Sequence, residues 1–118
     1  MNKLDSELVL ERLRTAGHEI VGRAAEADVV LYNTCSVRGH AEEKVFSRLG
    51  EQTKRKRRQK APLIIAVLGC MAQRLGSSLV ERVPGVDIVC GPSEIDRLAE
   101  LIDQAAAEHV PHVAVAPP

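Results

Sequence analysis

The sequence is poor in aromatic residues and in cysteine, and it has no long apolar run. Only 2% of the 118 residues are aromatic, which argues against a stacking platform for single-stranded nucleic acid. Three cysteines are too few, and too odd in number, for a disulfide scaffold. The apolar stretch 63–69 is far shorter than the roughly 20 residues of a membrane-spanning helix, and the N-terminus lacks a signal-peptide core. We therefore expect a cytoplasmic globular protein with no membrane partner.

The charge is balanced in total but unevenly distributed. Hydrophobic residues make up 45% and charged residues 27% of the chain, which is typical of one globular domain of this length. Six of the 16 basic residues form a single basic run: Lys54, Arg55, Lys56, Arg57, Arg58 and Lys60. The other ten basic residues stand against 16 acidic ones, so the run is a positive spot on an acidic body. We expect weak contact with nucleic-acid phosphates, and a solvated helix end is the alternative.

Helix-like and strand-like segments alternate along the chain. Strands are expected at 18–21, 28–34, 63–69 and 86–90, and helices are expected to begin at Asp5 or Ser6, at Ser36, near Ala72 and at Ser93. Gly17 suits the end of the first helix, and the third is expected to run to Val83. This order predicts an α/β domain over 1–108 with a doubly wound parallel sheet, followed by a loose tail or linker start over 109–118. Such a domain normally opens on a strand, whereas this one opens on a helix.

Two cysteines follow directly after predicted strands. Cys35 ends the strand 28–34, and Cys70 ends the strand 63–69. Ligands bind at the carboxyl edge of open parallel sheets, so both thiols are candidate ligands, although buried core positions are the equal alternative. A phosphatase loop is excluded, because Ala41 and Gly76 stand six positions later, where that loop needs an arginine.

The remaining candidate ligands have simpler interpretations. Cys90 ends the strand 86–90, and we expect a core residue there, with a ligand role as the alternative. His40 is expected on a helix face, and its alternative is a partner that supports the nearby ligand candidate Cys35. His109 and His112 are expected in a solvated tail, and metal binding is their alternative.

Four blocks of the sequence together resemble a known family. They are MNKLDSE at 1–7, ADVVLYNTCSVR at 27–38, GCMAQR at 69–74 and VDIV with Gly-Pro at 86–92. In this order and spacing they resemble the N-terminal domain of the radical-SAM methylthiotransferases over residues 1–102. Within that family, the NTCSVR and GCMAQ blocks resemble the MiaB type, which methylthiolates isopentenyladenosine next to the tRNA anticodon.

The resemblance implies a flavodoxin-like sheet and an auxiliary [4Fe-4S] cluster held by three cysteines. Cys35 and Cys70 match the second and third ligands. The first ligand belongs to a Gly-Cys-x-Met-Asn stretch whose Met-Asn matches Met1-Asn2, so that ligand and its strand are expected to be missing. The missing strand would be central, between 18–21 and 28–34. Cys90 is the alternative source of the third ligand.

The resemblance also implies parts that this sequence does not contain. S-adenosylmethionine and a second [4Fe-4S] cluster are expected on a radical-SAM domain, and a TRAM domain is expected to help bind the tRNA substrate. We therefore expect an N-terminal fragment that catalyses nothing alone. The alternative is a non-catalytic α/β binding module that has the fold without the cluster.

Overall fold

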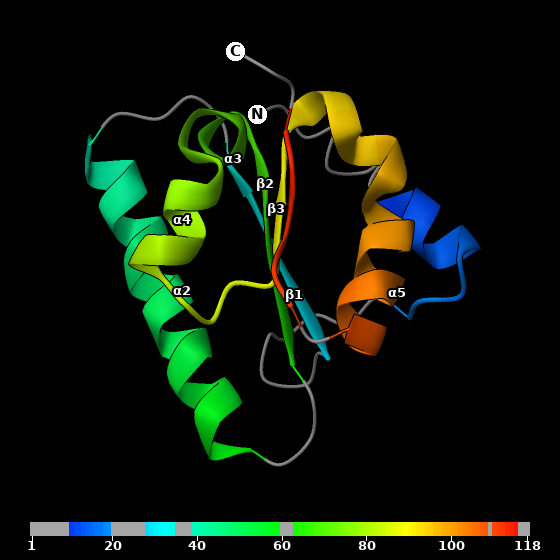
Figure 1. The fold of residues 1–118 in the computed structure, drawn as a ribbon, viewed down its shortest axis with the longest axis horizontal. Helices are drawn as coiled ribbons and strands as arrows, with labels where there is room; N and C mark the ends of the chain where they lie inside the picture. The colour runs from blue at the N-terminus through cyan, green and yellow to red at the C-terminus, as the bar shows by residue number, and fades with distance from the viewer. Residues whose placement is uncertain (1–9, 20–27, 35–38, 60–62, 109, 116–118) are drawn as a thin grey trace.

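The predicted parallel sheet is confirmed. The structure, a computed structural model, describes residues 10–19, 28–34, 39–59, 63–108 and 110–115. Across this part of the chain, a four-stranded sheet has the order β1 (Val29–Thr34), β2 (Ile64–Gly69), β3 (Ile88–Cys90) and β4 (His112–Ala114). Every neighbouring pair of these strands is parallel (Figure 1). The arrangement is consistent with a flavodoxin-like fold.

Helices cover both faces of the sheet. One face carries α2 (Gly39–Arg58), α3 (Cys70–Leu75) and α4 (Ser77–Arg82). The other face carries the 3-10 helix η2 (Pro92–Arg97), α5 (Leu98–Glu108) and a helical segment at 10–15 (Figure 1). None of the helices in the described ranges is both long and apolar enough to cross a membrane. The chain is therefore doubly wound, as the alternating pattern predicts.

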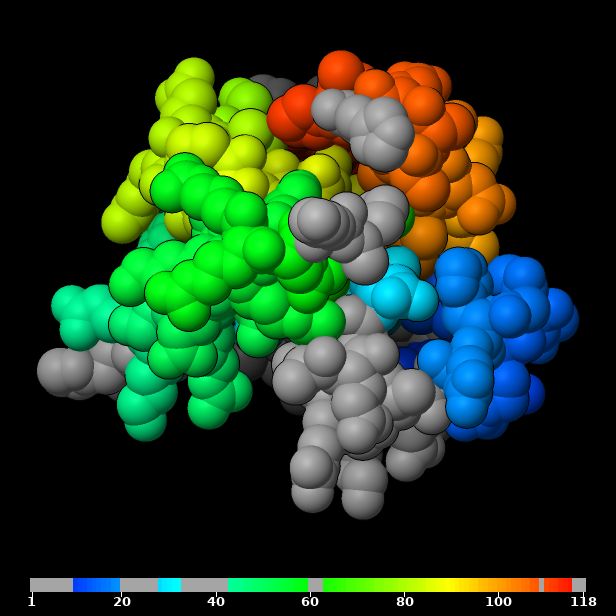
Figure 2. Space-filling view, turned by 90° about the horizontal axis from the view of Figure 1, so that it is seen from below, coloured from blue at the N-terminus to red at the C-terminus, as the bar shows by residue number. Residues whose placement is uncertain are grey.

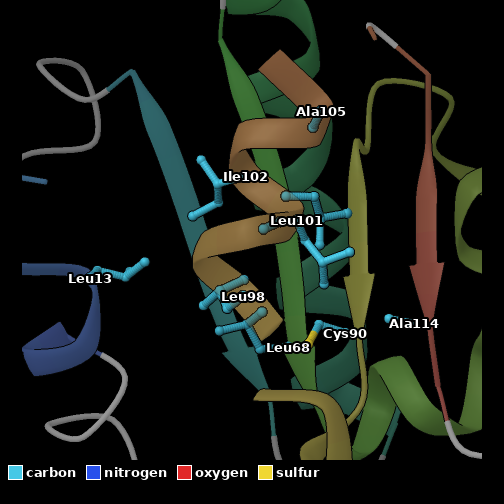
Figure 3. Packing of buried hydrophobic residues seen from close by; sticks show 10 residues of the cluster. Leu13, Leu68, Cys90, Leu98, Leu101, Ile102, Ala105 and Ala114 are labelled. Carbon is cyan, nitrogen blue, oxygen red and sulfur yellow. The ribbon is translucent and has the colours of Figure 1, made fainter. Parts of the chain in front are cut away.

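Strand β2 supplies side chains to two separate hydrophobic cores. Ala66 and Leu68 point to the α5 face, while Ile65 and Val67 point to the α2 face, and all four are at most 1% exposed. Figure 3 shows the α5-face core, where Leu98, Leu101 and Ile102 of α5 lie over the strands. A strand covered on both faces needs an uninterrupted apolar run, which explains why β2 is the plainest strand in the sequence.

The predicted helix over 72–83 is wrong as a single element, because it is two short helices. Helix α3 already begins at Cys70, and Gly76 separates it from α4. Gly76 has φ +52°, a value that side-chain-bearing residues rarely adopt, and its N–H donates to Ala72 O at 2.8 Å. The glycine therefore breaks the helix instead of only weakening it.

The predicted cap at Ser93 is also wrong. The N-cap is Gly91, no side chain caps η2, and α5 begins only at Leu98. The Glu94 N–H donates to Gly91 O at 3.0 Å, which is the three-residue spacing of a 3-10 turn, and Pro92 occupies its first position. The chain thus needs a tight turn here before the α-helix can begin.

The prediction of a loose tail from Val110 onward is wrong at 112–114. Strand β4 pairs there with β3: the His112 N–H donates to Asp87 O, and the Gly91 N–H donates to Ala114 O, both at 2.8 Å. Ala114 is buried in the α5-face core. Three residues carry too little periodicity to indicate a strand, so only the pairing partner identifies it.

Several N-terminal predictions fall wholly or partly outside the described residues. Gly17 has φ +102° just after the helical segment, as predicted, and the His18 N–H closes this turn on Leu13 O at 3.0 Å. The predicted strand 18–21 does not include His18 or Glu19, and its other two residues lie outside the described ranges. The helix start at Asp5 or Ser6, the cap at Ser36 and the expected gap for a central strand also lie outside them.

Candidate functional site

The register of β1 and β2 aligns the two strand ends that precede cysteines. The strands pair over six positions, and Thr34 lies opposite Gly69 at the carboxyl end. Cys70 follows Gly69, begins α3 and is exposed. Cys35 follows Thr34 in the sequence but lies outside the described residues. The position of Cys70 at the carboxyl edge is confirmed, and its closeness to Cys35 stays a prediction.

A glycine turn presents Cys70 at this edge. Gly69 has φ +98° and ψ −161°, and no side chain caps the N-terminus of α3. An L-residue with a Cβ would be strained in this conformation, so the immediate turn from β2 into α3 requires glycine. The next two residues, Met71 and Ala72, are at most 1% exposed, which leaves Cys70 as the accessible residue of this turn.

Cys90 is a core residue, as expected. It pairs with Leu68 across β2 and β3, and its side chain lies in the α5-face core (Figure 3). Its S–H donates to Gly91 O at 3.6 Å. Burial, with a smaller contribution from the charge of Glu94, raises the pKa of the Cys90 thiol to about 11. The protonated thiol is therefore the stable form at this position.

The described residues contain no complete metal site. Within ranges 10–19, 28–34, 39–59, 63–108 and 110–115, no three histidine, cysteine or acidic side chains come together to hold a metal ion. His112 begins β4, at the opposite edge from Cys70, and its buried Nε2 lies 3.5 Å from Glu108 Oε2. His40 lies in α2, and His109 lies outside the described residues. The expectation of a solvated tail is thus wrong for His112, which is only partly exposed.

The basic run lies at the amino edge of the sheet, opposite Cys70. Four of its residues form the last turn of α2, namely Arg55, Lys56, Arg57 and Arg58. Lys56 Nζ donates to Asp87 Oδ2 at 2.6 Å and to Gly85 O at 3.0 Å, and the same carboxylate oxygen accepts the Ile65 N–H at 2.9 Å. Since β2 spans about 17 Å, this anchor is far from Cys70.

The structure divides the basic run into anchored and exposed cations. Arg55 is half-buried and donates to Gln52 and Gln59, both at 3.1 Å. Lys54, Arg57 and Arg58 are exposed, whereas Lys60 lies outside the described residues. Figure 2 shows the C-terminal part of α2, in green, spread over this edge. The sequence predicts the run as one patch, because no local pattern indicates that Lys56 binds Asp87, which lies 31 positions later.

A curated relative and a family model match this chain. The model described as "Uncharacterized protein family UPF0004" matches residues 1–91. A protein of Syntrophotalea carbinolica named "tRNA-2-methylthio-N(6)-dimethylallyladenosine synthase" is 41% identical over 115 residues. That alignment covers 98% of this chain and 26% of the relative. The chain thus spans about a quarter of the length of the curated relative that it matches.

Proposed function

Because this chain belongs to the family UPF0004, the N-terminal domain of the MiaB-type methylthiotransferases, we propose that it holds an auxiliary [4Fe-4S] cluster. The proposed ligands from this chain are Cys35 and Cys70. The domain would serve a longer enzyme that methylthiolates isopentenyladenosine beside the tRNA anticodon. When bound through three thiolates, such a cluster leaves one iron open for the sulfur that the family transfers.

The register of β1 and β2 carries this proposal. Thr34 and Gly69 are partners at the ends of neighbouring strands, and in the sequence each of them is followed by a cysteine. With strands about 4.8 Å apart and consecutive Cα atoms about 3.8 Å apart, we expect the two cysteine Cα atoms to lie within about 12 Å of each other. Thiolates are the soft ligands that iron–sulfur clusters prefer. This register supports the proposal that Cys35 and Cys70 are two ligands at one edge of the sheet.

Cys90 does not fit the role of third ligand. Its side chain is fully buried, its S–H is directed at Gly91 O, and a ligand must be a thiolate. The family pattern instead puts the remaining cysteine in a Gly-Cys-x stretch ahead of the position that Met1 matches. We propose that ligand as the third one.

Iron binding tests the proposal directly. We would reconstitute the chain, lengthened at its N-terminus by a strand with the family's Gly-Cys-x stretch, using Fe²⁺ and sulfide without oxygen. About four irons per chain should survive desalting. Cys35→Ser and Cys70→Ser should each lose most of this iron. Cys90→Ser is the matched control and should keep it, because a serine hydroxyl can also donate to Gly91 O. A lengthened parent chain that keeps no iron would favour a binding module without a cluster. Cys35 and Cys70 variants that keep as much iron as the parent would overturn the proposed ligands.

We also propose tRNA as the partner of the longer enzyme, contacted weakly by this domain. The proposed contact uses the exposed cations Lys54, Arg57 and Arg58. Because they lie at the edge opposite Cys70, they would hold distant phosphates and add affinity without sequence choice. S-adenosylmethionine, the second cluster and the TRAM domain would belong to the remaining length of the enzyme.

The salt dependence of binding tests this contact. Changing Lys54, Arg57 and Arg58 together to Gln should reduce the log–log salt slope of tRNA binding by about two to three. Lys44→Gln is the matched control, because Lys44 is also exposed on α2 but lies ten positions, or about 15 Å, from Lys54. An unchanged slope in the triple variant would reduce the basic run to a solvated helix end.

A further inference from the structure

The side chain of Gln73 lies against the backbone of Gly91 at the carboxyl edge of the sheet. A Cβ atom at Gly91 would come within 2.3 Å of Gln73 Oε1 and 3.3 Å of Gln73 Cδ. Gly91 has φ −72° and ψ 164°, an extended conformation that any residue adopts. Glycine is therefore required here for the close approach of Gln73, and not for backbone freedom.

The backbone of Gly91 is held by hydrogen bonds on both sides. It is buried, and its N–H donates to Ala114 O at 2.8 Å. Its carbonyl oxygen accepts the Glu94 N–H at 3.0 Å and lies 3.6 Å from Cys90 Sγ. These bonds join the ends of β3 and β4 to the start of η2. A side chain that rests on Gly91 therefore rests on a rigid support.

Gln73 belongs to the short helix α3, which begins at Cys70. The helix has six residues, a glycine with positive φ at each end, and no side-chain cap at its N-terminus. Met71 and Ala72 anchor its inner side in the α2-face core. Cys70 and Gln73 are three residues apart, so they lie on the same side of the helix. Holding Gln73 in place therefore also limits how the turn at Cys70 can rotate.

We propose that Gln73 and Gly91 act as a positioning pair that fixes the direction in which Cys70 is presented at the carboxyl edge. This proposal rests on the proposed function only in one respect, namely that Cys70 binds a cluster. A partner that orients a metal ligand typically changes metal affinity by about 10–100-fold when it is removed.

Thiol reactivity tests the pair in the 118-residue chain without iron. We would measure the alkylation rate of Cys70 by iodoacetamide across a pH series, resolving each cysteine by mass spectrometry. Gln73→Ala and Gly91→Ala should raise the rate by the same factor, and the double variant should raise it no further, because both changes remove one contact. Gly50→Ala is the matched control, since its added Cβ would meet nothing within 4 Å beyond its chain neighbours and the nearby backbone of its own helix, and it should leave the rate unchanged. Additive effects in the double variant would overturn the pair.

Iron release adds a readout in the reconstituted, lengthened protein. Each single variant should lose iron to a chelator about tenfold faster than the parent. The closest clash in Gly91→Ala is with the terminal Oε1 of Gln73, which the added methyl group would displace. Gln73→Ala covers the case in which Gly91→Ala does not fold. Unchanged iron release in Gln73→Ala would overturn the positioning role. If the parent protein binds no iron, the proposed function fails, while the alkylation series still supports or overturns the pair.

Discussion

The two edges of the sheet are built in different ways. At the amino edge, the partly buried Asp87 carboxylate accepts hydrogen bonds from both Lys56 and the Ile65 N–H. At the carboxyl edge, Gly69 turns the chain sharply and exposes Cys70, and α3 has no side-chain cap. The Lys56–Asp87 contact at the amino edge therefore satisfies its polar groups within the protein, whereas the carboxyl edge leaves the Cys70 thiol exposed. This division agrees with the general rule that parallel sheets bind ligands at their carboxyl edge.

The basic run at the amino edge contains two kinds of cation, those anchored by hydrogen bonds and those exposed to solvent. Lys56 holds α2 against the start of β2 and β3, while Lys54 two residues earlier is exposed. Only the second kind is available to a polyanion. The following changes should act on one edge and spare the other.

The largest effect on stability is expected for Asp87→Ala. The change removes the partner of partly buried Lys56 and leaves the Ile65 N–H without its acceptor. We expect the free energy of unfolding to fall by about 3 kcal/mol, measured by urea denaturation. Asp87→Asn is the matched control and should cost less, because its amide oxygen still accepts the Ile65 N–H. Asp87→Ala should leave the alkylation rate of Cys70 unchanged. A changed rate would show that the two edges are not independent.

A smaller effect is expected from the ionisation of Cys90 in alkaline solution. Its folded-state pKa of about 11 lies above the ordinary value of 9.0. Below pH 9 the thiol is protonated whether or not the chain is folded, and between pH 9 and 11 the unfolded chain ionises first. Stability should therefore fall by about 2 kcal/mol over this range. The pKa of Tyr32 is also raised by burial, so its ionisation lowers stability in the same way. Cys90→Ser keeps this Tyr32 contribution, so the difference between the pH profiles of the parent and the variant measures Cys90 alone. Parallel pH profiles for the two proteins would contradict it.

The smallest effects are expected within the basic run. Lys56→Met should cost about 1 kcal/mol, because Asp87 loses its ion pair but keeps the Ile65 N–H. Lys54→Met, the matched change at an exposed position of the same helix, should stay within about 0.5 kcal/mol of the parent. Thermal unfolding of both variants measures the difference. Equal losses would mean that the contact of Lys56 with Asp87 contributes nothing to stability.

The sequence by itself determined the features that depend on neighbouring residues. The apolar run of β2 predicted a buried parallel strand, because a strand covered on both faces has no polar side. It also placed Cys70 at the strand end and Cys90 in the core. Gly17 marked a helix end, because the left-handed conformation after a helix favours glycine. These patterns are local, so a reader of the sequence can find them.

Only the tertiary structure decided the contacts between distant segments. Lys56 meets Asp87 across 31 positions, β4 exists because β3 offers it backbone partners, and Gln73 packs on Gly91 from another element. The sequence marked Gly76 as a weak point but did not predict that it would divide the helix, and it predicted a cap at Ser93 that the turn at Gly91 replaces. Local periodicity carries no information on which surface lies opposite a residue. That information arises only when the sheet forms and the helices pack on it.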